Sequence, residues 1–222
     1  TLMTIEKNVE QLEQVRKALK LEKFYLYGHS WGTMLGMDYY VKYPNGIQGL
    51  IFSSPLFSTK IWTDDADTLI ATLPEATQKA IRESERQKNY ENEAYKEAMN
   101  VYYKAYVRRS DKSKSQQDTA AKFFGENVYN FMWGPSEFTA TGNLLNYNRL
   151  KDLPKITVPT LLTAGEYDEA RPSSVRYYAS LIPGAQFKEI PHAAHSTMMD
   201  NPKEYIGVLR EFLKKMDAIS PK

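Results

Sequence analysis

The chain has 222 residues, of which 42% are hydrophobic, so it can bury a core as one domain or as a domain with an insertion. Its 29 basic and 27 acidic residues leave a net charge of +2, which gives no reason to expect nucleic acid or an anionic membrane surface as a partner. The absence of cysteine excludes disulfides, a cysteine nucleophile and thiolate metal sites, and no apolar run approaches the roughly 20 residues that span a bilayer, so we predict a soluble, cytoplasmic protein.

The first predicted elements are a helix over residues 4–20 and a short strand over residues 24–27. Thr4 can cap the helix with its side-chain oxygen. Apolar residues recur along the helix at spacings of three and four, which predicts one buried face made of Val9, Leu12, Val15 and Leu19. The strand is the apolar and aromatic run FYLY, and such a run is typical of a buried strand.

A glycine-rich turn follows this strand, with the sequence GHSWG at residues 28–32, and a helix-compatible run follows the turn. The pattern G-x-S-x-G between a strand and a helix is typical of a nucleophile elbow. In such an elbow the serine occupies a strained corner, and the flanking glycines let the two backbones pass closely. We therefore predict that Ser30 is an exposed nucleophile and that the main-chain amide of Trp31 donates to an oxyanion.

The middle of the chain changes character after a second strand, which is predicted at residues 47–52. Residues 58–150 are helical in pattern, rich first in charge and then in aromatic residues, and lack the alternation typical of strands. We predict that they form a helical cap, inserted into a core made of residues 1–57 and 151–222.

Strands and helices alternate again in the last third of the chain. Strands are predicted at residues 158–164 and 186–190, and helices at residues 172–181 and 202–218. Because strands that alternate with helices pair in parallel, we predict an α/β fold with a mostly parallel sheet. In the last helix we expect one side to be buried, with Tyr205, Val208, Leu209, Phe212 and Met216.

Three strand ends carry residues that can do chemistry: Ser30, Asp168 and His195, in this order along the chain. The carboxyl ends of parallel strands lie on one edge of a sheet, so residues far apart in the sequence can converge there. The order Ser, Asp, His is the one expected for an α/β-hydrolase triad. We predict that Ser30 is the nucleophile, that His195 is the general base and then the general acid, and that Asp168 orients the imidazole ring.

Other residues compete for two of these roles. His192 is a rival base, but it lies close to its strand and has less loop with which to reach the elbow, whereas His29 is expected to pack beside the nucleophile. Glu166 and Glu169 compete for the role of the acid, and the Gly-x-x-Asp pattern at the strand exit favours Asp168. The histidines lack the helical H-x-x-x-H spacing of a zinc site, so we expect no metal and no cofactor.

The segments GHSWGTMLG, GEYDEARP and PHAAHS, together with MWGPSEFTATGN from the predicted cap, resemble the prolyl aminopeptidase (proline iminopeptidase) family of α/β hydrolases, and the tricorn-interacting aminopeptidases in particular. The resemblance spans nearly the whole chain. It implies an α/β-hydrolase fold with an inserted helical cap. It also implies a serine exopeptidase that releases an amino-terminal residue, often proline, from short peptides or amides.

The same resemblance implies how the substrate is held. Glu137 of the cap and Glu169, next to the triad aspartate, are similar in placement to carboxylates that bind the free α-amino group in that family. A charge-assisted contact of this kind separates a terminal ammonium from a mid-chain amide. The residues alone favour a different reading, in which Glu137 is an exposed glutamate at a helix start beside Ser136. Cap aromatics can wall a proline-sized pocket or belong to the core, namely Tyr129, Phe131, Trp133 and Phe138.

One segment of the family pattern has no counterpart in the sequence. It is the glycine-rich run H-G-G-P-G, whose amide supplies the second oxyanion donor. Without the strands around it, residues 24–27 would form a strand with an unpaired edge. We therefore expect the chain to be the carboxyl-terminal part of a longer enzyme, with an amino-terminal polypeptide as a partner that completes the sheet and the oxyanion hole.

Three functions stay open on the sequence. The first is a serine aminopeptidase that acts on prolyl or other small amino-terminal residues, with a short peptide as its substrate. The second is an amino-acid amidase or esterase with the same triad. The third is an inactive fragment or binding module, because the loss of one oxyanion donor costs roughly 100- to 1000-fold in turnover.

Overall fold

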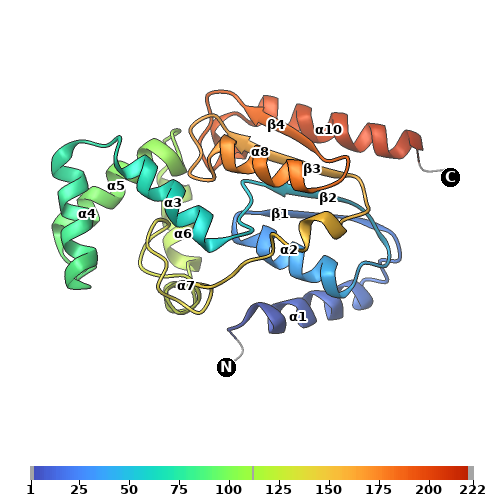
Figure 1. Ribbon diagram of the computed structural model, residues 1–222, viewed down its shortest axis with the longest axis horizontal. Helices are drawn as coiled ribbons and strands as arrows, with labels where there is room; N and C mark the ends of the chain where they lie inside the picture. The colour runs from blue at the N-terminus through green and yellow to red at the C-terminus, as the bar shows by residue number, and fades with distance from the viewer. Residues whose placement is uncertain (1–2, 112, 220–222) are drawn as a thin grey trace.

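A four-stranded parallel sheet forms the centre of the computed structural model, which describes residues 3–111 and 113–219 (Figure 1). The strands follow one another in the sheet in chain order, as β1 (Phe24–His29), β2 (Ile47–Ser53), β3 (Thr160–Gly165) and β4 (Gln186–Ile190). All three neighbouring pairs are parallel. The predicted parallel α/β fold is therefore confirmed, and so are the positions of the strands to within two residues at each end.

Helices cover both faces of the sheet. On one face lie α1 (Ile5–Ala18), α2 (Trp31–Lys42) and α8 (Pro172–Leu181), and their apolar side chains share one core with β2 and β3. On the other face lies α10 (Pro202–Ile219), where Phe212 and Met216 pack on Ile51 and Leu161. Neighbouring residues of β2 thus point to opposite faces, as strand geometry requires. The predicted buried side of the last helix is confirmed at Tyr205, Phe212 and Met216, whereas Val208 and Leu209 are partly buried.

The expectation that residues 24–27 form a buried strand is wrong, whereas the expectation that this strand has an unpaired edge is confirmed within the described residues. Within the described part of the chain, β1 is an edge strand that pairs with β2 on one side. Its residues from Phe24 to Leu26 are partly buried, and Tyr27 is 45% exposed. An edge position explains this, because its residues have a strand neighbour on one side.

The first helix is capped as predicted, but its buried face differs. The Oγ1 atom of Thr4 accepts a hydrogen bond from the amide of Lys7 at 3.3 Å. Val9 is buried, whereas Val15 and Leu19 are more than half exposed, so the predicted face is wrong in the second half of the helix. Glu13 is buried there instead, because its carboxylate pairs with guanidinium and phenol donors that satisfy it.

The segment between β2 and β3 is helical and lies at one end of the sheet (Figure 1). It contains α3 (Thr59–Ile70), α4 (Glu75–Gln87), α5 (Glu93–Tyr102), the π-helix η1 (Tyr103–Val107), α6 (Lys114–Phe123), α7 (Glu126–Met132) and the 3₁₀-helix η2 (Leu153–Lys155). Part of it has its own apolar cluster, which includes Ile70, Ile81, Tyr95 and Tyr102. The boundaries of the cap at residues 58 and 150 stay our proposal.

The short helix α9 (Thr197–Asp200) lies between β4 and α10 and was not predicted. No helix in the described ranges is long and apolar enough to cross a membrane. The same residues contain no group of three or more side chains that could hold a metal ion.

Candidate active site

Ser30 stands at the corner between β1 and α2. Its φ and ψ angles are 54° and −127°, a left-handed conformation that a residue other than glycine rarely adopts. Main-chain bonds hold it there: its amide donates to the carbonyl of Ser53 at 3.0 Å, and its carbonyl accepts from the amide of Thr33 at 2.8 Å. The hydroxyl of Thr33 donates to the same carbonyl at 2.6 Å. The strained corner expected of a nucleophile elbow is therefore present.

The two glycines of the elbow differ in what they permit. A Cβ atom on Gly28 would lie 2.3 Å from the main-chain oxygen of Gly32, which is impossible without moving the backbone. A Cβ atom on Gly32 would meet nothing within 4 Å. Close passage of the two backbones thus requires glycine at position 28 and not at position 32. Trp31 begins α2, so its amide has no partner inside the helix and is available to an oxyanion.

Asp168 and His195 are buried side by side at the ends of β3 and β4. The Nδ1 atom of His195 donates to Oδ1 of Asp168 at 2.8 Å, since a carboxylate only accepts. The amide of Ala170 donates to the same oxygen at 2.8 Å, and the amide of Gly165 donates to Oδ2 at 3.0 Å. These bonds fix the tautomer of His195 and leave its Nε2 atom free to take a proton.

Two residues that the sequence did not single out for this purpose hold the pair in place. The hydroxyl of Ser54, a fully buried residue with a φ of 50°, donates to Oδ2 of Asp168 at 2.6 Å. The Nε2 atom of His29 donates to the carbonyl of His195 at 2.9 Å, and their ring centroids are 4.8 Å apart. Burial and the neighbouring charge of His195 lower the pKa of His29 to about 4, so His29 is neutral at pH 7. His29 therefore holds the loop that carries His195.

The free Nε2 atom of His195 is buried and has no hydrogen-bond partner. The hydrogen bond with Ser30 is thus not formed, which is common before a substrate binds. The indole ring of Trp62 packs edge-on against His195, with centroids 5.6 Å apart. Trp62 and Ser30 line the same cavity, which has a volume of about 580 Å³. Burial opposes the charged form of His195, but the charge and hydrogen bond of Asp168 and the charge of Glu137 outweigh it and raise the pKa of His195.

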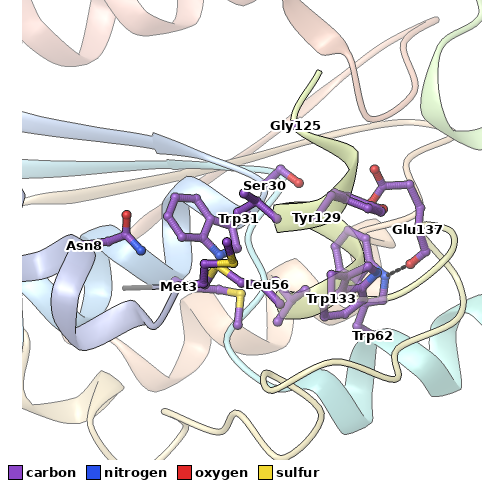
Figure 2. Close-up of a pocket in the computed structure, with 13 residues that line it drawn as sticks. Met3, Asn8, Ser30, Trp31, Leu56, Trp62, Gly125, Tyr129, Trp133 and Glu137 are labelled. Atoms are coloured by element: carbon purple, nitrogen blue, oxygen red, sulfur yellow. Dashed lines mark hydrogen bonds between the residues drawn. The ribbon is translucent and has the colours of Figure 1, made fainter. Parts of the chain in front are cut away.

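Two carboxylates lie near His195, and one of them lines this cavity. Glu137 lines it, and its carbonyl accepts from the indole of Trp62 at 2.7 Å (Figure 2). Glu169 is 1% exposed, neither of its carboxylate oxygens has a hydrogen-bond partner, and one lies 3.9 Å from Nε2 of His195. Burial raises the pKa of both glutamates, and for Glu169 the charges of Glu137 and Asp168 raise it further. The imidazole of His195 is thus the basic group beside Glu169, and among the described residues neither carboxylate forms an ion pair with a lysine or an arginine.

The four predicted pocket aromatics separate into two groups. Tyr129 and Trp133 line the cavity (Figure 2). Phe131 does not line it and is 46% exposed. Phe138 does not line it either, because it is buried in the cap cluster with its ring 4.7 Å from that of Tyr102. Trp62, which the sequence did not single out, provides a wall instead.

The rival residues lie elsewhere. The side chain of His192 is 84% exposed, and its amide donates to Oε2 of Glu166 at 2.8 Å. Neither residue touches Asp168 or His195 through a hydrogen bond given by the structure. Their position is that of a surface turn.

The helical segment between β2 and β3 is hydrogen-bonded to the loops that carry Glu169 and His195. The carbonyl of Tyr106 in η1 accepts from the amides of Glu169 at 3.3 Å and His195 at 3.0 Å. The carboxylate of Asp200 accepts from the amide of Ala194 at 2.9 Å and from that of Ser110 at 2.8 Å. Burial opposes ionisation of Asp200, but its main-chain donors outweigh burial and lower its pKa. No sequence signal pointed to these contacts.

Comparisons with known proteins show which family the chain resembles. Residues 3–202 match the family model described as the alpha/beta hydrolase fold. A proline iminopeptidase of Heyndrickxia coagulans is 36% identical over 217 residues, which are 97% of this chain and 75% of the relative. A proline iminopeptidase of Thermoplasma volcanium is 34% identical over 214 residues, which are 96% of this chain and 72% of the relative.

Solved structures give the same result. The proline iminopeptidase of Mycobacterium smegmatis superposes with a TM-score of 0.89 at 30% identity, over 99% of this chain and 74% of that one. The protein VinJ also superposes with a TM-score of 0.89, at 29% identity, over 96% of this chain and 73% of that one.

Proposed function

The chain belongs to the proline iminopeptidase family of α/β hydrolases, and we propose that it is a serine aminopeptidase that releases an amino-terminal residue, above all proline, from short peptides. The observation that carries the proposal is the pair Glu137 and Glu169. Glu137 lines the cavity that contains Ser30, and the carboxylate of Glu169, which has no hydrogen-bond partner, lies 3.9 Å from Nε2 of His195. A substrate ammonium supplies the permanent cation that neither carboxylate has among the described residues.

The chemistry follows from the roles of the triad. Ser30 attacks the first peptide carbonyl while Nε2 of His195 takes its proton, and Asp168 stabilises the imidazolium that forms. The amide of Trp31 donates to the oxyanion. His195 then gives its proton to the leaving amine, and an acyl-enzyme remains on Ser30. Water, activated by the same histidine, releases the amino-terminal residue.

The amine contact fixes how much of the substrate lies before the scissile bond. Because Glu169 lies 3.9 Å from the catalytic nitrogen, an ammonium between the two glutamates is only about one residue away from the reacting carbonyl. A longer stretch before the bond would push the ammonium past the carboxylates or bury an amide against them. The geometry therefore favours an exopeptidase over an endopeptidase.

The walls of the amine end favour a compact, apolar residue. The rings of Trp62 and Trp133 lie edge to face, with centroids 6.1 Å apart, and the ring of Tyr129 stands beside them (Figure 2). Aromatic walls of this kind suit the flat, uncharged ring of proline.

We also propose that a further polypeptide segment pairs with the free edge of β1 and supplies the second oxyanion donor. The unpaired edge within the described residues supports this, and so does the single donor that the elbow offers at Trp31. The comparisons do not support a separate partner chain, since the relatives align with 97% of this one. Intact-mass analysis of active material tests for a separate partner chain. A second polypeptide in the active material supports the partner chain, and a single active species of 25.6 kDa refutes it. The predicted cytoplasmic location stays a proposal that rests on the cysteine-free sequence.

The test compares proline, alanine and leucine p-nitroanilides with N-acetylproline p-nitroanilide and with a short acyl ester. An aminopeptidase cleaves the free-amine anilides and loses nearly all activity when the amine is acetylated. An amidase or esterase without amine recognition treats the blocked and free substrates alike. Equal rates on the two proline anilides would refute the assignment of Glu137 and Glu169.

A further inference from the structure

The cavity extends to both sides of Ser30, and the proposed amine contact uses only one of them. In Figure 2, Ser30 lies between Glu137 and Trp133 on one side and Met3 and Asn8 on the other. The volume of about 580 Å³ is within the range that holds a ligand much larger than one amino acid. The half that lies away from Glu137 is therefore available to the rest of the substrate.

This second half is apolar and uncharged. We call it the leaving-group subsite and define it by Met3, Asn8 and Trp31, which line the cavity there (Figure 2). Met3 is held by the cap loop, since Asn143 Nδ2 donates to its carbonyl at 2.8 Å. The polar residue of the subsite, Asn8, is neutral, and its Nδ2 atom is already bonded to the carbonyl of Thr4 at 2.8 Å.

One polar group of the subsite is unused. The indole Nε1 of Trp31 is buried and has no hydrogen-bond partner. A buried donor without an acceptor is unfavourable, so a carbonyl that binds beside it gains a hydrogen bond at little cost. The peptide group that follows the second residue of a substrate brings such a carbonyl.

We propose that the leaving-group subsite binds the second residue of the peptide and selects an apolar side chain there, with Trp31 Nε1 donating to the main chain of that residue. The inference rests on the proposed function, because the amine site sets the direction of the chain across Ser30. A charged side chain in this half would lose its hydration without finding an opposite charge among Met3, Asn8 and Trp31, which define the subsite. An apolar side chain gains from leaving water.

The experiment measures kcat/KM for the amides Pro-Leu-NH2, Pro-Asp-NH2 and Pro-Lys-NH2, with proline p-nitroanilide as a reference, in three proteins. These are the wild type, Asn8→Asp and the control Asn92→Asp. Asn8→Asp puts a charge in the subsite near the first turn of α1, where an acidic residue suits the helix dipole. Asn92→Asp makes the same change at the N-cap residue of α5. There too the side chain loses a hydrogen bond from its Nδ2 atom to a carbonyl, but the residue lines none of the described cavities.

In the wild type we expect Pro-Leu-NH2 to exceed both charged peptides by about tenfold or more. Asn8→Asp should raise the ratio of Pro-Lys-NH2 to Pro-Asp-NH2 by about tenfold, since the new carboxylate attracts one and repels the other. Asn92→Asp should leave that ratio unchanged. The subsite is overturned if the wild-type kcat/KM values for the three amides lie within twofold of one another, or if the ratio of Pro-Lys-NH2 to Pro-Asp-NH2 shifts equally in both variants. Turnover of proline p-nitroanilide in that case still supports the proposed function. No turnover of any proline substrate overturns both.

Discussion

Replacing Glu169 by glutamine separates amine recognition from the chemistry of the triad. The variant keeps the size and shape of the side chain and removes its charge. Glu169 does not hydrogen-bond to Asp168 or His195, and its carboxylate has no other hydrogen-bond partner. The bond between His195 and Asp168 should therefore survive the change.

The structure sets the size of the effect. A contact between an ammonium and a buried carboxylate is worth about 1.5–3 kcal/mol, so Glu169→Gln should lower kcat/KM on proline p-nitroanilide by roughly 10- to 100-fold. A short acyl ester has no ammonium to lose. Its kcat/KM should change by less than about threefold, because the triad and Trp31 are untouched.

The same variant should be more stable than the wild type. Burial first, and then the charges of Glu137 and Asp168, raise the pKa of Glu169 well above 4.5. An acid whose pKa is raised by folding lowers the stability of the fold as the pH rises from 4.5 through the raised value. Glu169→Gln removes that penalty, so its free energy of unfolding at pH 8 should exceed that of the wild type by about 1–3 kcal/mol. The difference should disappear as the pH falls to 4.5.

Steady-state kinetics on the two substrates and urea unfolding at several pH values measure these effects. Equal losses on the anilide and the ester would refute the reasoning, because they would place Glu169 in the catalytic machinery. Unchanged anilide kinetics would do so too, since the amine would then bind elsewhere. A variant less stable than the wild type at pH 8 would contradict the stated origin of the raised pKa.

Three further predictions concern the scaffold around the site. Gly28→Ala should lower the free energy of unfolding by more than about 2 kcal/mol in urea titrations, because its Cβ would lie 2.3 Å from a carbonyl oxygen. Gly32→Ala should change this free energy little, because its Cβ would meet nothing within 4 Å. Similar losses in the two variants would contradict the account of the elbow. Asp200→Asn should lower kcat more than KM and shift the pH profile of kcat, because it loosens the loop of His195; an unchanged profile would limit Asp200 to a structural role. The hydrogen bond from Arg16 lowers the pKa of Glu13 to about 2, so wild-type stability should hold above pH 4.5 and decline toward pH 2, and Glu13→Gln should flatten that decline in acid-unfolding curves.

The sequence could predict the parts of the fold that local patterns determine. The strands β2 and β3 were predictable because each is a mostly apolar run between turn residues. The elbow was predictable because the pattern G-x-S-x-G between a strand and a helix is typical of one backbone geometry. The partial burial of β1 did not follow from its own residues, since a run such as FYLY has the same pattern at a sheet centre and at an edge. Its unpaired edge could be expected only from the family segment that the sequence lacks.

The site, like the fold, has contacts that the sequence could predict and contacts that it could not. The bond between Asp168 and His195 could be expected from the order of strand ends. The supports from Ser54, Asp200 and the carbonyl of Tyr106 could not, because main-chain and loop contacts have no residue pattern. Phe131 and Phe138 show the limit of composition: an aromatic residue in a cap can face solvent, a core or a cavity, and only packing decides which.

The central claim is that Ser30 is the nucleophile of an aminopeptidase, and covalent labelling tests it most directly. A fluorophosphonate probe and proline p-nitroanilide turnover are to be measured on the wild type and on Ser30→Ala, with the labelled peptide identified by mass spectrometry and folding checked by circular dichroism. The account predicts one label on Ser30, competition by a free-amine proline substrate, and a folded alanine variant with neither label nor turnover. A label on another residue, or turnover that survives in Ser30→Ala, would contradict it.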